Sequence, residues 1–62
     1  IVGTEEITVD GYRGIIEYTE NTVRLNTAKF IIKINGSNLV LKEAAAEFIT
    51  ISGIINGVEY VL

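Results

Sequence analysis

Cysteine, histidine, proline, methionine and tryptophan are all absent from this chain of 62 residues. Without cysteine no disulfide can form, and without cysteine or histidine the preferred zinc ligands are missing, so we expect neither a metal nor any other cofactor. Histidine is also the side chain most often used in general acid–base catalysis, and its absence argues against an enzyme. Because methionine is missing and the chain starts with Ile1, we interpret it as a trimmed piece of a longer protein.

The length of the chain predicts a single domain over residues 1–62. A domain of this size buries only about 60% of the surface that its unfolded form exposes, so its stability is marginal. Small domains usually recover stability through disulfides, metals or association, and the first two are not expected here. We therefore expect association, either as a homo-oligomer or with flanking sequence.

Positive charge is scarce and scattered. Five Lys and Arg residues stand against eight Asp and Glu, which gives a net charge of −3 and a pI near 4.6. Binding to nucleic acid needs clustered cations, and no such cluster occurs, so we do not expect a nucleic-acid partner. No apolar run approaches the roughly 18 residues of a membrane span, so none is expected in this segment. The five cations are Arg13, Arg24, Lys29, Lys33 and Lys42.

The residues that dominate the chain are β-branched. Ile, Val and Thr contribute 11, 6 and 6 residues, and these side chains favour strands. Apolar residues alternate with polar ones with a period of two, most clearly at Phe30, Ile32 and Ile34, with Lys29 and Lys33 on the other face. The predicted core consists of the apolar residues that share a face in each run: Ile7, Val9, Ile16, Tyr18, Val23, Leu25, Phe30, Ile32, Ile34, Leu39, Leu41, Ile49, Ile51 and Val58.

Turn signals separate these runs. Asp10-Gly11 and Asn56-Gly57 tolerate positive φ, and residues 20–21 and 35–38 also have the composition of turns. Gly53 predicts a bulge or bend within an apolar run. This spacing predicts an all-β fold, an antiparallel meander of six or seven short strands curled into a small barrel or roll.

One segment is not typical of a strand. Residues 42–47, Lys-Glu-Ala-Ala-Ala-Glu, contain three alanines, which favour helix, but six residues are too few for a stable helix. We expect one helical turn or a wide loop there.

Candidate chemical sites are weak. Glu17 lies between Ile16 and Tyr18, where burial would raise its pKa, but a solvent-facing position or a pair with Arg24 across a hairpin explains it better. The acids of residues 43–47 lack the spacing of an EF-hand loop, and residues 11–14 lack the Lys-Ser/Thr of a phosphate loop. We expect no catalytic, cofactor-binding or metal-binding residue.

A second apolar face is the clearest functional hint. Phe48 is out of phase with Ile49 and Ile51, so it points to the opposite face, together with Ile31 and Val40. Apolar side chains on both faces of a small sheet indicate a contact surface, whereas packing of two layers is the alternative. We predict protein–protein interaction through Ile31, Val40 and Phe48, or through pairing of an edge strand.

Five short blocks, at residues 14–19, 23–27, 31–42, 48–55 and 59–60, follow one another in an order that resembles the YabP/YqfC family of sporulation proteins. Residues 14–19 followed by 23–27 are similar to its glycine, apolar pair, acid and tyrosine, and its Arg-apolar-Asn strand. Residues 31–42 resemble its strand, glycine turn and second strand. Residues 48–55 resemble the closing strand, and residues 59–60 match its terminal acid and aromatic residue. Tyr12 replaces the usual His or Asn, which leaves open whether the chain is YabP-like or YqfC-like.

The resemblance implies a non-enzymatic protein of endospore-forming bacteria that is needed for the envelope, cortex or coat of the spore. It implies partners within the sporulation machinery and a place on the cytoplasmic side of the sporulating cell or in the spore. Two alternatives remain: a small barrel that binds RNA or a small ligand through aromatic residues, and an enzyme that uses two carboxylates in a cleft.

Overall fold

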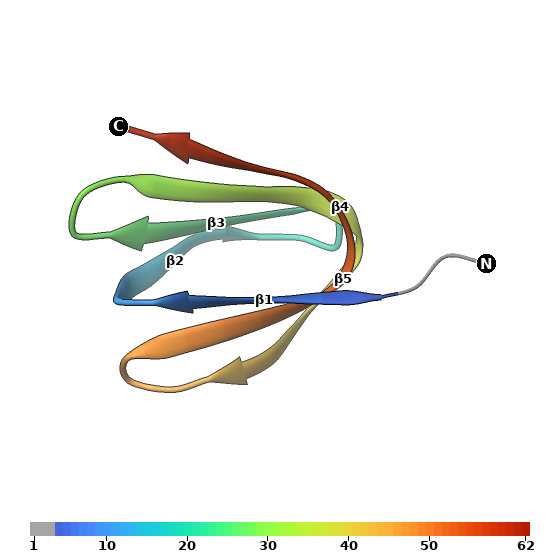
Figure 1. The fold of residues 1–62 in the computed structure, drawn as a ribbon, viewed down its shortest axis with the longest axis horizontal. Helices are drawn as coiled ribbons and strands as arrows, with labels where there is room; N and C mark the ends of the chain where they lie inside the picture. The colour runs from blue at the N-terminus through green and yellow to red at the C-terminus, as the bar shows by residue number, and fades with distance from the viewer. Residues whose placement is uncertain (1–3) are drawn as a thin grey trace.

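The computed structural model describes residues 4–62 as one antiparallel sheet of five strands, with no helix in this range. The strand order is β1-β5-β4-β3-β2, so the last four strands form a meander and β1 returns to pair with β5 (Figure 1). The predicted all-β antiparallel class is confirmed, although the sheet is not closed into a barrel. The strands are β1 (Glu5–Asp10), β2 (Tyr12–Tyr18), β3 (Thr22–Thr27), β4 (Ile31–Ala44) and β5 (Phe48–Val61).

Five strands form, not six or seven, because two predicted turns lie inside strands. β4 and β5 each have 14 residues and pair along most of their length. Asn35 lies opposite Gly57, and Gly36 lies opposite Ile55, so the ladder crosses both Asn-Gly dipeptides with register shifts and no reversal of the chain. Bulges of this kind retain strand pairing while they bend a strand, which explains why the turn prediction was wrong here.

The bend in the middle of β4 and β5 depends on one close approach of the two backbones, at Gly36, and on two residues with positive φ, Asn38 and Gly53. At Gly36, an added Cβ atom would lie 2.0 Å from the carbonyl oxygen of Ile54. Asn38 has φ of 54° and Gly53 has φ of 149°, both outside the range that most side chains favour. The bend predicted at Gly53 is therefore confirmed. Figure 1 shows the two strands curving together at one end, so that the sheet folds back on itself as an open roll.

The core lies between the two halves of the folded sheet. Residues 31–35 of β4 pair with β3, whereas residues 48–53 of β5 pair with β1. We call the face that carries the core side chains the inner face. Its fully or nearly fully buried hydrophobic residues are Val9, Val23, Leu25, Ile32, Ile34, Leu39, Ile49 and Ile51, all of them in the predicted core.

Six further predicted core residues are less buried. Ile7, Phe30 and Leu41 are half-buried and pack against the core. Ile16, Tyr18 and Val58 are 44%, 48% and 39% exposed, so their prediction as core was wrong. The first two belong to the edge strand β2, where the register shifts between Ile15 and Glu17. Val58 shares the inner face, but it lies beyond Gly53, where the pairing of β1 with β5 ends.

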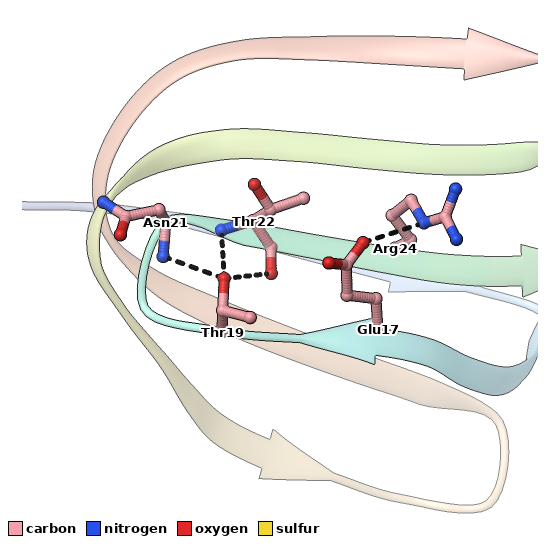
Figure 2. A network of polar contacts seen from close by, with 5 residues as sticks. All are labelled: Glu17, Thr19, Asn21, Thr22 and Arg24. Atoms are coloured by element: carbon pink, nitrogen blue, oxygen red, sulfur yellow. Dashed lines mark hydrogen bonds and ion pairs between the residues drawn. The ribbon is translucent and has the colours of Figure 1, made fainter.

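The hairpin of β2 and β3 follows the prediction for residues 17–24. Glu17 lies opposite Arg24, and the two form an ion pair of 3.0 Å (Figure 2). In the turn, the Thr19 hydroxyl oxygen accepts hydrogen bonds from the backbone N–H groups of Asn21 and Thr22. This side-chain mimicry of a backbone turn fixes the chain reversal that was predicted at residues 20–21.

The remaining connections are short. Gly11, with φ of +76°, makes the corner between β1 and β2 that the sequence predicts. The alanine segment is neither a helical turn nor a wide loop, because β4 continues to Ala44 and residues 45–47 form the hairpin loop. Tertiary contacts explain this outcome: the Tyr12 hydroxyl donates a 2.9 Å hydrogen bond to the carbonyl oxygen of Ala45, and the N–H of Gly11 donates to the carbonyl of Glu47.

Candidate interaction site

An apolar groove lies where the roll stays open. Its volume is about 420 Å³, and it separates β1 from the start of β4 and the end of β5. We call it the β1 groove. Its lining residues come from three segments far apart in the sequence: Ile7, Thr8, Val9, Asp10, Phe30, Ile32, Val58 and Tyr60.

The floor of the β1 groove is inner face that the fold leaves uncovered. Val58 lies opposite Ile34 and Tyr60 lies opposite Ile32, and both of those partners are buried. Residues opposite one another in a ladder share a face, so Val58 and Tyr60 point to the core side. They are nevertheless 39% and 68% exposed. The core is thus continuous with an apolar surface that is open to a neighbour.

Aromatic packing holds one part of this surface in place. The rings of Phe30 and Tyr60 meet edge to face, with centroids 5.1 Å apart. This arrangement is favourable for aromatic pairs and fixes the Tyr60 ring over the start of β4. The lining of the groove thus includes a packed aromatic pair.

One wall of the β1 groove is an open strand edge. β1 stands at the end of the strand order and pairs only with residues 48–53 of β5. Its other edge carries backbone N–H and C=O groups that no strand of the described residues 4–62 pairs. Such an edge is a template for another strand. A partner bound at β1 could thus pair with the strand edge and also contact the apolar groove.

The outer face of β1 is polar and already engaged. Thr8 and Thr50 share a hydrogen bond of 3.0 Å between their hydroxyls, and Thr50 is only 7% exposed. Lys42 of β4 reaches across β5 to form an ion pair with Glu6. The Glu6 carboxylate accepts a hydrogen bond from the Lys42 ammonium and attracts its charge, which raises the pKa of Lys42 above its ordinary value. These contacts cover the outer face of β5 next to β1. The apolar surface that a partner could contact is therefore on the groove side.

The structure separates the three residues that sequence reasoning selected as an outward patch. Val40 is 54% exposed and lies opposite Ser52, just past the bend. Ile31 lies opposite Asn26 and Val61, and Phe48 lies opposite Asp10. Both of these are half-buried, and no two of the three are cross-strand neighbours. Their role in interaction stays a prediction.

Sequence reasoning did not select Val58 and Tyr60 as contact residues, although their alternation with Glu59 was visible. The sequence pattern shows which face of a strand is apolar. It does not show which part of that face remains uncovered by other strands. That depends on where β1 pairs along β5, and this register stops at Gly53.

A second, more polar hollow has two acidic residues in its lining. Asp10 and Glu47 line it together with Tyr12 and Arg13, and its volume is about 610 Å³. No group of three or more Asp and Glu side chains suited to a metal ion occurs among residues 4–62.

Comparison with known proteins decides the family. The sequence model of the YabP family matches residues 1–62. The chain belongs to the YabP family. It is 36% identical over 61 residues to the protein YqfC of Bacillus subtilis (strain 168), a match that covers 98% of this chain and 66% of that protein. About a third of YqfC therefore lies outside the matched region. The resemblance stated from the sequence is confirmed, and membership of this family suggests a sporulation-related protein. Within residues 4–62, no helix is long and apolar enough to cross a membrane.

Proposed function

We propose that this YabP-family domain is a non-enzymatic structural or adaptor module that binds a protein partner during formation of the spore envelope, cortex or coat. The β1 groove is the contact surface. In this proposal the domain acts on the cytoplasmic side of the sporulating cell or becomes part of the spore. Binding there covers Val58 and Tyr60 and pairs the free edge of β1.

The observation that carries the proposal is the exposed inner face at the end of β5. A small domain gains most of its stability from covering apolar surface. Tyr60 is nevertheless 68% exposed on the core side of the sheet, beside a strand edge that no strand of residues 4–62 pairs. A tyrosine in such a position offers a large apolar ring and a polar hydroxyl, a combination that is enriched at protein interfaces.

The chemistry of the side chains supports a role in binding over one in catalysis. The sequence has no histidine or cysteine to act as a base or nucleophile at neutral pH. Two of its eight carboxylates, Glu6 and Glu17, are held in ion pairs with Lys42 and Arg24. Those pairs also engage two of the five cations, which leaves little positive charge for RNA.

Self-association, which the size of the domain predicts, has a separate surface in this proposal. The edge strand β2 exposes 46% of Ile15 and 44% of Ile16. Light scattering at rising concentration tests it: wild type should show dimers that Ile16→Lys reduces, and a strictly monomeric wild type would remove the homo-oligomer from the proposal.

A second candidate is a binding site for a small apolar ligand. The Phe30–Tyr60 pair and the 420 Å³ groove favour it, since ligand pockets are mostly apolar and largely formed in advance. A small ligand would not use the strand edge of β1, which is why we rank this candidate second.

Spore counts test the proposed function. In a spore-forming host that carries this gene, Tyr60→Glu should lower the yield of heat-resistant spores to the level of a gene deletion. Binding of an apolar partner would bury the new carboxylate without a compensating charge, which is unfavourable. Asn56→Glu, an exposed position of the same strand outside the groove and outside the predicted patch, should leave the yield unchanged. Circular dichroism of both purified variants verifies that they fold. A deletion strain with a normal spore yield would refute the role in sporulation, and a folded Tyr60→Glu variant with normal spores would refute the groove.

A further inference from the structure

We infer that the β1 groove receives one extended strand of a partner protein, with alternating apolar side chains and a Lys or Arg at each end. This inference rests on the proposed function and specifies the chemistry of its partner. Three features carry it: the length and edge of β1, the shape of the apolar surface beside it, and the charges on β1.

The free edge of β1 favours an extended chain over a helix. β1 has six residues, which is about 20 Å of strand. A strand paired with it would continue the β1–β5 half of the sheet over the open part of the roll. About three of its side chains would then point to the inner face and fill the groove against Ile32, Val58 and Tyr60. A helix would leave the backbone groups of β1 unpaired.

The charges on β1 specify the ends of the incoming strand. β1 carries Glu5, Glu6 and Asp10 and no cation. Lys42 already engages Glu6, so Glu5 and Asp10 remain, one at each end of the strand. Opposite charges on paired strands attract and like charges repel, so a basic residue at each end suits this edge best. Lys29 lines a hollow next to Asp10, so the preference for a cation is stronger at the Glu5 end.

The same charges disfavour a second copy of this chain through β1. Pairing two β1 strands would bring six carboxylates to one short ladder, offset by the two Lys42 side chains and by Lys29 next to Asp10 in each copy. The net charge of −3 on each copy adds to this repulsion. A different protein with a basic, apolar strand is the better match.

Binding of short synthetic peptides to the intact chain tests the inference. The first peptide alternates Val and Thr over seven residues with Lys at both ends, and the second is identical except for Glu at both ends. The third keeps the Lys ends but has Pro at its centre, which removes a ladder hydrogen bond. Fluorescence anisotropy of the labelled peptides should show the first binding about tenfold more tightly than either of the others. The preference for Lys over Glu should shrink at high salt, because exposed charges are screened.

Variants of the protein assign the effect to the groove and to its charges. Tyr60→Glu should weaken binding of the first peptide at least about tenfold, whereas Asn56→Glu, at an exposed position of the same strand outside the groove, should not change it. The double variant Glu5→Gln, Asp10→Asn should bring the Lys-ended and Glu-ended peptides to within about twofold of each other. The matched double variant Glu20→Gln, Glu43→Gln removes the same charge elsewhere and should keep the preference.

Several results would overturn the inference. Equal binding of the Pro-containing peptide excludes strand pairing and favours a compact apolar ligand. Equal binding of Lys-ended and Glu-ended peptides excludes the basic partner. If no peptide binds while wild type is a dimer that Tyr60→Glu dissociates, the occupant is a second copy. In each of these cases the spore yield of Tyr60→Glu still decides the proposed function separately.

Discussion

The backbone N–H of Leu41 donates a 2.9 Å hydrogen bond to the hydroxyl oxygen of Tyr18. Tyr18 ends β2, and Leu41 lies in the second half of β4, past the bend, so this bond joins the two halves of the folded sheet on one side of the roll. On the other side, between β1 and the end of β5, no hydrogen bond makes such a link among residues 4–62. The β1 groove lies on the side that lacks this link.

Tyr18→Phe should lower the stability of the domain. The substitution keeps the ring and removes the acceptor of the Leu41 N–H, which costs about 1 kcal/mol. For a domain of this size the melting temperature should fall by about 4–8 °C. Tyr60→Phe is the matched control, because the Tyr60 ring is 68% exposed and its loss of a hydroxyl should change the melting temperature little. Equal melting temperatures for Tyr18→Phe and wild type would mean that the bond contributes no stability.

Gly36→Ala should be among the most damaging small substitutions in the chain. Its Cβ atom would lie 2.0 Å from the carbonyl oxygen of Ile54, so the two long strands would have to move apart. We expect a loss of about 3 kcal/mol in the free energy of unfolding, measured by urea denaturation. Gly57→Ala is the control, since no atom lies within 4 Å of its added Cβ. If both variants lose the same stability, the close approach at Gly36 does not explain the loss.

Asn38 should respond in opposite directions to two small substitutions. Its φ of 54° suits glycine and is unfavourable for alanine, because a Cβ atom without a local hydrogen bond costs about 1 kcal/mol in this region. Asn38→Gly should therefore keep or slightly raise the melting temperature, and Asn38→Ala should lower it. A lower melting temperature for the glycine variant than for the alanine variant would contradict this account of the bend.

The Lys42–Glu6 pair should make stability depend on pH under alkaline conditions, where Lys42 loses its proton. The pKa of Lys42 is raised in the folded state, so the folded chain holds the Lys42 proton more tightly than the unfolded chain does. The stabilisation is thus complete below the unfolded pKa of about 10.4 and is lost as the pH rises through the higher folded pKa. Because the pair is exposed, we expect a small effect.

Denaturation from pH 8 to about pH 11 tests this pH dependence. Lys42→Gln should remove part of the alkaline loss of stability that wild type shows. Lys29→Gln, which also removes one exposed lysine, should leave that loss unchanged. A wild-type curve that matches the Lys42→Gln curve throughout would show that the pair does not contribute.

Much of the fold follows from local patterning. The period of two places Val23, Leu25, Ile32, Ile34, Ile49 and Ile51 on one face, and all of them are buried. The Gly11 corner, the turn at residues 20–21 and the Glu17–Arg24 pair also follow from neighbouring residues. Local composition misled where pairing over a long range competes with it. The two Asn-Gly sites lie within β4 and β5, because bulges let both strands stay paired and bury one continuous face.

The candidate site was only partly accessible from the sequence. An apolar surface for a neighbour was expected, but on the outward side at Ile31, Val40 and Phe48. The structure offers the β1 groove on the inner face, at Val58 and Tyr60, which the alternating pattern groups with the core. A pattern tells which face of a strand is apolar, whereas the pairing of other strands determines how much of that face is covered.

The sequence by itself determined the all-β class, the inward residues of every strand except β2, and the family. Each depends on residue types a few positions apart, or on their order along the chain. The tertiary structure alone decided that β4 and β5 run unbroken through a bend, that β1 pairs with β5 only as far as Gly53, and that the inner face beyond it stays open. Those outcomes depend on contacts between residues as much as 48 positions apart, such as Glu5 and Gly53, whose pairing no local pattern encodes.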